Sequence, residues 1–187
     1  MAKNTNILMI RHGEKPSSGT GLTLSGQERA YAYIVYFQNY ILQSGPNTDP
    51  VKLNYLFASA DSSSSDRPDL TITPLSAAIM VPVDATYKDA DYKKLAGEIL
   101  NNSQYDQSNI LICWHHQEIL NLATALHVDA TKLPSGNKWP SKWPGEEYGW
   151  LLQICYDSNG NIINSQTLCI NQKLMYDDQS DPPAPQS

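Results

Sequence analysis

The chain has 187 residues, 41% of them hydrophobic, and a net charge of -6 at pH 7. This length fits one domain with a well-filled core, and the negative charge disfavours nucleic acid and anionic membranes as partners. No apolar stretch approaches the roughly 20 residues of a membrane span, and the apolar run at the start is too short for a secretory signal. Three cysteines, an odd number at wide spacing, indicate buried free thiols. We therefore expect a cytoplasmic protein with no nucleic-acid or membrane partner.

The first informative stretch is NILMIRHGEKP, residues 6 to 16. The apolar run Ile7 to Ile10 predicts a buried parallel strand, which ends on Arg11, His12 and Gly13. In open α/β sheets, ligands bind beyond the carboxyl ends of the strands. Arg11 offers a planar fork of donors for phosphate or carboxylate, and His12 offers a nitrogen that can attack or accept a proton. An isolated R-H-G fits a surface strand end equally well, so its weight depends on signals further along the chain.

A helix is expected next. Ser25 and Glu28 have the S-x-x-E spacing of a capping box, which places the helix start near Gly26. Apolar residues then keep the spacing of one helical face until Gly45 and Pro46, which should end the helix.

The middle of the chain predicts a second strand and further helices. Leu53 to Ser59 indicates a short strand, followed by a serine-rich loop that carries Arg67. An irregular helix interrupted by Pro74 should come next, then a short strand at Val81 to Val83. Asp91 to Asn101 has the pattern of an amphipathic helix.

Asn109 to Trp114, NILICW, is the second clear buried strand. It ends on His115 and His116, and Ile119 to Leu126 then continue as a helix. The pattern of the first strand is thus repeated. Because parallel strands end at the same edge of a sheet, both histidine-bearing ends should face one site.

The last part of the chain predicts a β-hairpin and a tail. Tyr148 to Tyr156 and Ile162 to Ile170 flank the turn-forming stretch Asp157 to Asn161, DSNGN. We expect a single domain over residues 1–176 and a disordered tail over residues 177–187.

Several motifs occur in an order that a known family shares. They are RHGEKP at Arg11 to Pro16, LTLSGQERA at Leu22 to Ala30, the set Ser59, Arg67 and Thr71, and ICWHH at Ile112 to His116. With these motifs the chain resembles the histidine phosphatase superfamily, also called the phosphoglycerate mutase-like fold. The resemblance covers most of the chain. It implies an α/β three-layer sandwich, with a mostly parallel central sheet between helices and a C-terminal hairpin.

The resemblance also implies roles for individual residues. His12 would be the nucleophile that takes a phosphoryl group from substrate and passes it to water, Arg11 and Arg67 would bind phosphate oxygens, and a second histidine would donate to the same group. Guanidinium forks and imidazole N–H groups suit the charge on a phosphoryl group in transfer. We therefore expect a metal-independent phosphatase without cofactors, acting on a phosphorylated small molecule or phosphoprotein through a phosphohistidine intermediate.

The identity of the second histidine is open between two neighbours. In the family's commonest pattern, an apolar strand and one small residue precede the histidine, which points to His115. The chain looks closer to members with tryptophan, an acidic residue and then histidine, which points to His116. We favour His116, with His115 as a rim residue making a hydrogen bond.

Other site residues have weaker support. SADSSSSDR inserts several residues between Ser59 and Arg67 compared with the family, so the place of Ser59 in the pocket is an open expectation. Glu14 and Lys15 lie close enough to the nucleophile to tune it, and Lys15 could reach an anionic substrate. A surface salt bridge between them is the simpler interpretation.

The general acid for the leaving group has no clear candidate in the sequence. Larger members of the family carry a glutamate or aspartate well after the second arginine. Asp84, Asp89 and Asp91 lie in that region here. Each is expected to be a solvated surface carboxylate.

Other functions remain as alternatives. The chain could be a regulatory module that keeps the pocket as an anion site, or, less in keeping with its short length, a phosphomutase. A metal site at His115, His116 and Glu118 is disfavoured because adjacent side chains at a strand end point in opposite directions. The proline- and tryptophan-rich loop Lys132 to Gly145 could border the crevice or cover the sheet edge.

Overall fold

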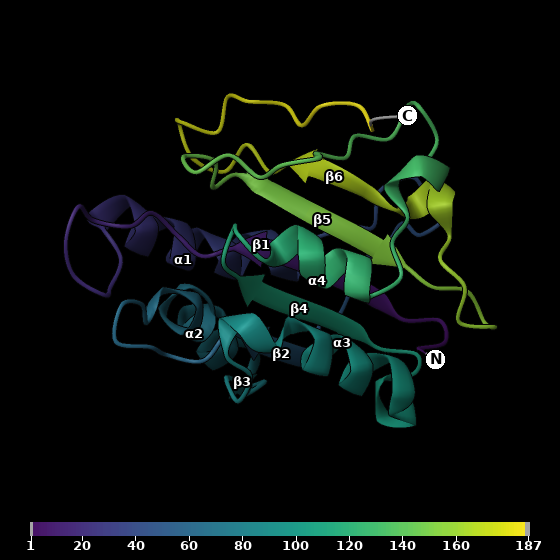
Figure 1. Cartoon of the computed structure of the whole chain (residues 1–187), viewed down its shortest axis with the longest axis horizontal. Helices are drawn as coiled ribbons and strands as arrows, with labels where there is room; N and C mark the ends of the chain where they lie inside the picture. Colours follow the sequence, from purple (N-terminus) through teal and green to yellow (C-terminus); the bar gives the residue numbers. More distant parts are fainter. Residues whose placement is uncertain (1, 186–187) are drawn as a thin grey trace.

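The computed structural model describes residues 2–185, and its centre is a six-stranded sheet in the order β3-β2-β4-β1-β5-β6 (Figure 1). The strands are β1 (Asn6–Arg11), β2 (Tyr55–Ala58), β3 (Val83–Asp84), β4 (Asn109–Trp114), β5 (Trp150–Cys155) and β6 (Leu168–Asn171). β1, β2, β3 and β4 run parallel, and β5 and β6 add an antiparallel pair beside β1. The mostly parallel sheet and the pairing of the last two strands confirm the predicted fold class.

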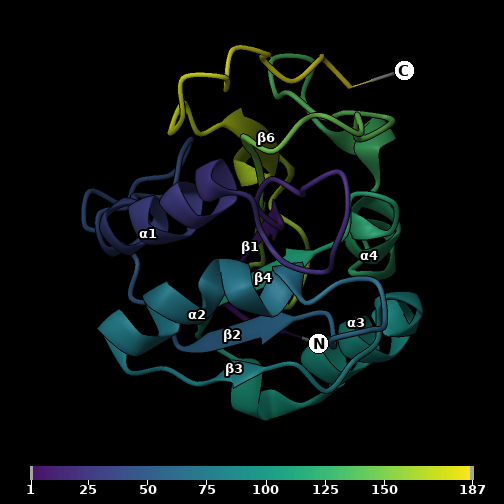
Figure 2. The same ribbon diagram turned by 90° about the vertical axis from the view of Figure 1, so that its left-hand side faces the viewer.

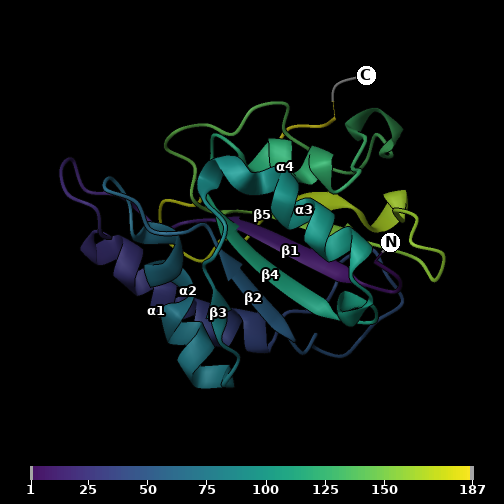
Figure 3. The ribbon, with the colours of Figure 1, turned by 60° about the horizontal axis from the view of Figure 1, so that its bottom comes forward.

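Helices cover both faces of this sheet. α1 (Leu24–Gln38) and α2 (Arg67–Ile79) lie on one face, and α3 (Tyr92–Asn101) and α4 (Ile119–Ala125) lie on the other (Figure 2, Figure 3). Short 3-10 turns occur at Asp89–Asp91, Ser103–Tyr105, Ala130–Lys132 and Asn164–Gln166. Within residues 2–185, no helix combines the length and the apolar character that crossing a bilayer requires.

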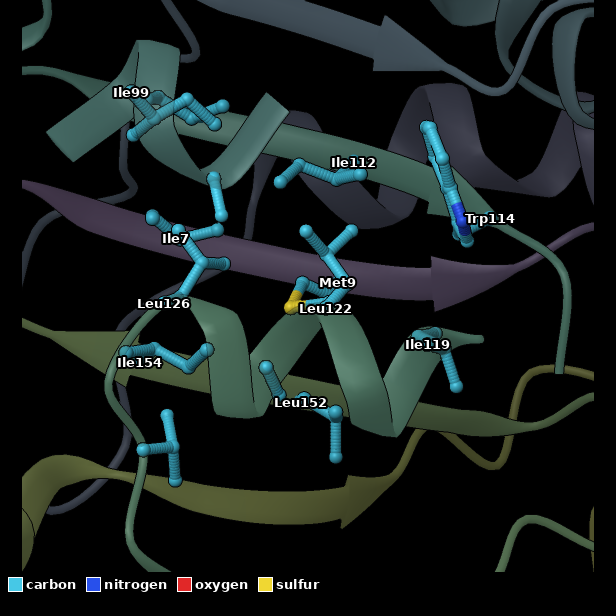
Figure 4. Packing of buried hydrophobic residues seen from close by; sticks show 14 of the residues in the cluster. Ile7, Met9, Ile99, Ile112, Trp114, Ile119, Leu122, Leu126, Leu152 and Ile154 are labelled. Atoms are coloured by element: carbon cyan, nitrogen blue, oxygen red, sulfur yellow. The ribbon is translucent and has the colours of Figure 1, made fainter. Parts of the chain in front are cut away.

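The two faces of β1 contribute to two separate cores. Ile7 and Met9 pack under α3 and α4, as the close view of the core shows (Figure 4). Leu8 and Ile10 belong to the cluster under α1 and α2. All four side chains are fully buried, because successive residues of a strand point to opposite faces and both faces are covered. This double burial explains why the sequence of β1 is a continuous apolar run.

The ends of α1 differ from the prediction. The N-cap is Thr23, whose hydroxyl accepts a hydrogen bond from the Gly26 N–H at 3.1 Å, so Ser25 does not form a capping box. The helix ends at Gln38, well before Gly45. Beyond it the chain turns to bury Tyr40 and Leu42, and this burial outweighs continuation of the helix.

Two further boundaries also differ. α2 is continuous from Arg67 to Ile79 and includes Pro74, which the sequence predicted to interrupt it. β6 begins at Leu168 and not at Ile162, because the 3-10 turn Asn164–Gln166 occupies the first part of the predicted strand.

The end of the chain packs against the body over the part that the structure describes. Asp178 is buried, the Trp150 indole N–H donates to the Ser180 carbonyl at 2.7 Å, and the Trp139 N–H donates to the Pro183 carbonyl at 2.8 Å. This placement differs from the disorder predicted for residues 177–187, because one side chain and two backbone carbonyls of this segment have partners that a sequence pattern does not reveal. Residues 186–187 lie outside the described part of the chain.

The loop after β1 is in direct backbone contact with the first turn of α1. A Cβ on Gly13 would lie 2.9 Å from the Gly26 carbonyl oxygen, and a Cβ on Gly26 would lie 2.7 Å from the Glu14 carbonyl oxygen. Both distances are shorter than Cβ contacts allow. The absence of two side chains therefore lets the loop that follows the RHG motif rest on the helix.

We expect Gly26→Ala to lower the free energy of unfolding by about 1–3 kcal/mol, because the added methyl group meets backbone that cannot turn aside. Gly97 in α3 provides the matched control, since a Cβ there meets only the end of the Asn101 side chain, at 3.9 Å. Gly97→Ala should raise stability by up to about 1 kcal/mol. Urea unfolding of both variants tests this, and equal stability changes would show that the contact is unimportant.

Candidate active site

The two histidine-bearing strand ends lie side by side. β1 and β4 are adjacent and parallel, with Arg11 in register with Trp114. The His12 N–H donates to the Trp114 carbonyl at 3.2 Å, and the rings of His12 and His115 lie with their centroids 5.0 Å apart. This is the sheet edge that faces the viewer in Figure 2. The meeting of the two motifs, inferred from the parallel strands, is thus present in the structure.

His12 is buried and held in one orientation. It is 2% exposed, and its Nδ1–H donates to the Gly13 carbonyl at 2.7 Å. This bond leaves the lone pair on Nε2. Burial, followed by the positive charge of Arg11 and the nearby His115 and Arg67, lowers the pKa of His12 to about 2. The imidazole is therefore neutral near pH 7, as a nucleophile must be.

The ring contact favours His115 over His116 as the partner of His12, the reverse of the preference drawn from the sequence. His115 follows Trp114 directly, so the register of β1 and β4 brings it beside His12. Burial, and then Arg67, His116 and Arg11, lower its pKa to about 4. His116 lines the same cavity, and its buried Nδ1 has no hydrogen-bond partner among residues 2–185.

A cavity of about 300 Å³ opens over these rings. Its basic lining consists of Arg11, His12, Lys15, Arg67, His115 and His116. Such a concentration of donors on a chain of negative net charge marks a local anion site.

Arg11 is fully buried and is held by backbone carbonyls. Its Nη1 donates to the carbonyls of Gly145 at 2.6 Å and Glu147 at 2.9 Å, and its guanidinium carbon lies 3.8 Å from the centre of the Tyr148 ring. No carboxylate of the described chain forms an ion pair with it. Burial lowers its pKa. Nε and Nη2 have no partner among the described residues, so two donors are available to a ligand anion.

Arg67 is the first residue of α2, and backbone carbonyls also fix it. Its Nη1 donates to the Thr20 carbonyl at 3.1 Å, and its Nη2 donates to the Ser64 carbonyl at 3.2 Å. Its Nε is buried and has no partner in the described part of the chain. Both arginines are therefore oriented before any ligand arrives.

The serine loop contributes hydroxyl groups to the rim. Ser62, Ser64 and Ser65 line the cavity, as does Lys15. Ser59 is fully buried after β2 and is not part of the cavity lining, and its Oγ has no hydrogen-bond partner among the described residues. The inserted residues noted in the sequence take its place at the rim.

Among residues 2–185, Asp89 is the one carboxylate that lines the cavity. Partial burial, and then the charge of Glu118, raise its pKa to about 6. Its Oδ1 is buried without a partner among residues 2–185, and its carbonyl accepts a bond from the Trp114 indole N–H at 3.3 Å. The expectation of a solvated carboxylate is therefore wrong for Asp89. Neither Asp84 nor Asp91 is part of the cavity lining. Asp84 accepts a hydrogen bond from the Thr86 N–H, and Asp91 forms an ion pair with Lys94.

Glu14 follows Gly13 in the loop after β1 and is not part of the cavity lining. It forms an ion pair of 2.6 Å with the buried Arg29, and Arg29 forms a second pair of 2.7 Å with Asp178. The surface salt bridge expected for Glu14 and Lys15 is thus replaced by a buried pair with Arg29. Neither Arg29 nor Asp178 stood out in the sequence as a site residue.

The loop from Lys132 to Gly145 packs on the core and does not line the cavity. Trp139 and Trp143 are buried in the core below α4, so most of the loop is a packed cover. Its end supplies the carbonyl of Gly145 that holds Arg11. Tyr148, just beyond the loop, was missed by the sequence analysis although it stacks on Arg11.

The described residues contain no cluster of side chains suited to binding a metal ion. Within residues 2–185, no group of three or more histidine, cysteine, aspartate or glutamate side chains could hold a metal ion. The arrangement instead combines a neutral imidazole with a free Nε2, fixed guanidinium donors and a protonatable carboxyl group. Such a set can bind an anion, attack it and protonate a departing group.

Comparison with known proteins gives similarity at the level of structure. No family model matches the sequence, and no curated protein matches it. Among solved structures, the protein histidine phosphatase SixA complexed with tungstate matches with a TM-score of 0.58 and 13% identity, covering 87% of this chain and 96% of that one. Phosphoglycerate mutase from Plasmodium falciparum matches with a TM-score of 0.52 and 15% identity, covering 88% and 93%. The chain therefore has the phosphoglycerate mutase-like fold that these two structures share.

Proposed function

We propose that this chain is a metal-independent phosphatase of the histidine phosphatase superfamily, in which His12 forms a phosphohistidine intermediate. One observation carries the proposal most directly. The neutral His12, with its lone pair on Nε2, lies beside two fixed arginines that keep unpartnered donors. A phosphoryl group in transfer needs this combination of a nucleophile and matched positive charge.

In the first step, Nε2 of His12 attacks phosphorus and the bond from phosphorus to the leaving oxygen breaks. Arg11, Arg67 and the N–H of His115 hold the equatorial oxygens, where negative charge develops. Asp89 gives its proton to the leaving oxygen and becomes a carboxylate, and an alcohol departs.

In the second step, a water molecule attacks phosphorus and the bond from phosphorus to Nε2 breaks. Asp89 takes the proton that water loses, which restores the carboxylic acid, and inorganic phosphate leaves. A pKa of about 6 suits this double role, because acid and base forms are both populated near neutral pH.

The substrate class follows from the openness of the site. Ser62 and Ser64 are exposed at the rim, and Lys15 is exposed beside them, so a phosphate carried on a larger body can reach the cavity. We propose a phosphorylated small molecule or a phosphorylated protein side chain as substrate. The structural similarity to a protein histidine phosphatase that holds tungstate is in keeping with this class.

His12→Ala should abolish turnover of para-nitrophenyl phosphate in the presence of a chelator, because the variant lacks the nitrogen that forms the intermediate. His115→Ala should reduce kcat/KM by about 10²–10³, the usual effect of losing one donor to the transition state. His116→Ala should cost less than about tenfold. Steady-state kinetics, with circular dichroism to check folding, measures all three.

A larger loss in His116→Ala than in His115→Ala would exchange the roles of the two histidines. A wild-type protein that binds vanadate but turns over no phosphoester would instead establish the regulatory anion-binding module as the function. Loss of wild-type turnover on addition of the chelator would contradict a metal-independent reaction.

Asp89→Asn should reduce kcat/KM for an alkyl phosphate by about 10²–10⁴, because the alkoxide then leaves without a proton. With para-nitrophenyl phosphate the loss should be much smaller, since para-nitrophenolate is a stable anion. In the wild type, kcat/KM for the alkyl phosphate should fall as pH rises above about 6, where Asp89 loses its proton. Asp91→Asn is the matched control, and equal losses on both substrates would rule out Asp89 as the acid.

A further inference from the structure

The segment after β6 carries a buried carboxylate, Asp178. Asp178 is 4% exposed, and its Oδ1 and Oδ2 accept hydrogen bonds from Nη2 and Nη1 of Arg29 at 2.7 and 3.0 Å. The backbone N–H groups of Leu174 and Met175 donate to the same Oδ2, each at 3.0 Å. The yellow segment that carries Asp178 lies beyond β6 in Figures 1 and 2. Four donors thus fix this carboxylate in one geometry.

Arg29 also binds the loop that follows His12. Nη2 and Nε of Arg29 donate to Oε1 of Glu14 at 2.6 and 3.0 Å. Arg29 itself is 1% exposed and lies on α1, one turn after Gly26. Asp178 and Glu14 therefore bind adjacent edges of one planar guanidinium group and share its Nη2, so a shift of the first displaces the second.

Glu14 is directly connected to the group that orients the nucleophile. The Gly13 carbonyl, which is part of the peptide unit joining Gly13 to Glu14, accepts the Nδ1–H of His12 at 2.7 Å. The Glu14 carbonyl in turn accepts a bond from the Thr23 N–H at 2.9 Å. The side chain and the backbone of Glu14 are thus both anchored to α1, and the acceptor for His12 lies next to these anchors.

Asp178 also contacts the segment that holds Arg11. A Cβ on Gly149 would lie 2.5 Å from Cγ of Asp178, so the carboxylate rests directly on this backbone. The Gly149 N–H donates to Oε1 of Glu147 at 2.8 Å, and the Glu147 carbonyl accepts a bond from Arg11 at 2.9 Å. Asp178 therefore lies between the two segments that orient His12 and Arg11.

We propose that Asp178 is a positioning residue for the reaction and that the segment after β6 is part of the active-site framework. Through Arg29 and Glu14, Asp178 keeps the Gly13 carbonyl where it can accept the Nδ1–H of His12, and this bond keeps the lone pair on Nε2. The inference rests on the proposed function for its effect on turnover. Its effect on the His12 tautomer is independent of that function.

The competing interpretation is that the segment serves only to stabilise the fold. Removal of Asp178 would then lower the melting temperature, but a folded variant would keep the wild-type kcat and the wild-type state of His12. The two interpretations therefore differ in a property of the nucleophile itself.

The experiment compares Asp178→Asn with Asp177→Asn in the full-length chain. Asp177 is the adjacent exposed carboxylate and forms no ion pair within the described residues, so it is the matched control. Gly149→Ala is a second variant, because its added methyl group displaces Asp178 without removing a charge. For each protein we would measure kcat and KM for para-nitrophenyl phosphate, the melting temperature, and the 15N spectrum of labelled histidines, with His12→Ala to assign the His12 signals.

In the wild type and in Asp177→Asn, His12 should appear only as the tautomer protonated on Nδ1. In Asp178→Asn and Gly149→Ala both neutral tautomers should be populated, and kcat should fall by about tenfold or more with KM within about twofold, at a temperature where each variant is folded. A folded Asp178→Asn with the kcat and the histidine spectrum of Asp177→Asn would overturn the inference. So would a fall in kcat with an unchanged tautomer.

A result that contradicts the proposed function is distinguishable from one that contradicts the role of Asp178. A wild-type protein without phosphatase activity would contradict that function, while the histidine spectra would still decide whether Asp178 controls the state of His12.

Discussion

The site depends on one hydrogen bond inside the protein, from Nδ1 of His12 to the carbonyl of Gly13. It selects the tautomer in which Nε2 keeps a lone pair, and burial keeps the ring neutral by disfavouring its charged form. Much of the surrounding structure serves this arrangement. The Gly13 N–H donates to the Thr71 hydroxyl at 2.8 Å. The backbone of Gly26, which has no side chain, packs directly against the same loop. The fold therefore determines the chemical state of His12 as well as its position.

The fold was largely predictable from the sequence because both faces of the sheet are covered. Strands buried on both sides have continuous apolar sequences, and β1 and β4 stood out for that reason. The limits of α1 were not predictable in the same way. Ser25 fits a capping box as well as Thr23 fits an N-cap, and burial of Tyr40 and Leu42 ends the helix early. Tertiary packing decided these boundaries, and local patterns do not report it.

The sequence predicted which types of residue form the candidate site better than it predicted the contacts between them. Arg11, His12 and Arg67 were expected and line one cavity. The contact of His115 with His12 depends on the register between β1 and β4, which is a property of the sheet and not of either segment alone. Asp89 differs from the nearby Asp84 and Asp91 in lining the cavity and in its raised pKa, and composition shows neither property.

The ion group of Glu14, Arg29 and Asp178 joins residues from the two ends of the chain, and this has a consequence for biosynthesis. Arg29 and Asp178 are separated by 149 positions, and β1 pairs with β5 near the other end of the sequence. β1 and Arg29 therefore lack these partners on the ribosome until β5 and Asp178 have been translated. Contacts between such distant residues also form late in folding, because a long loop must close first. A nascent chain thus completes the ion group beside the His12 loop only after Asp178 has emerged from the ribosome.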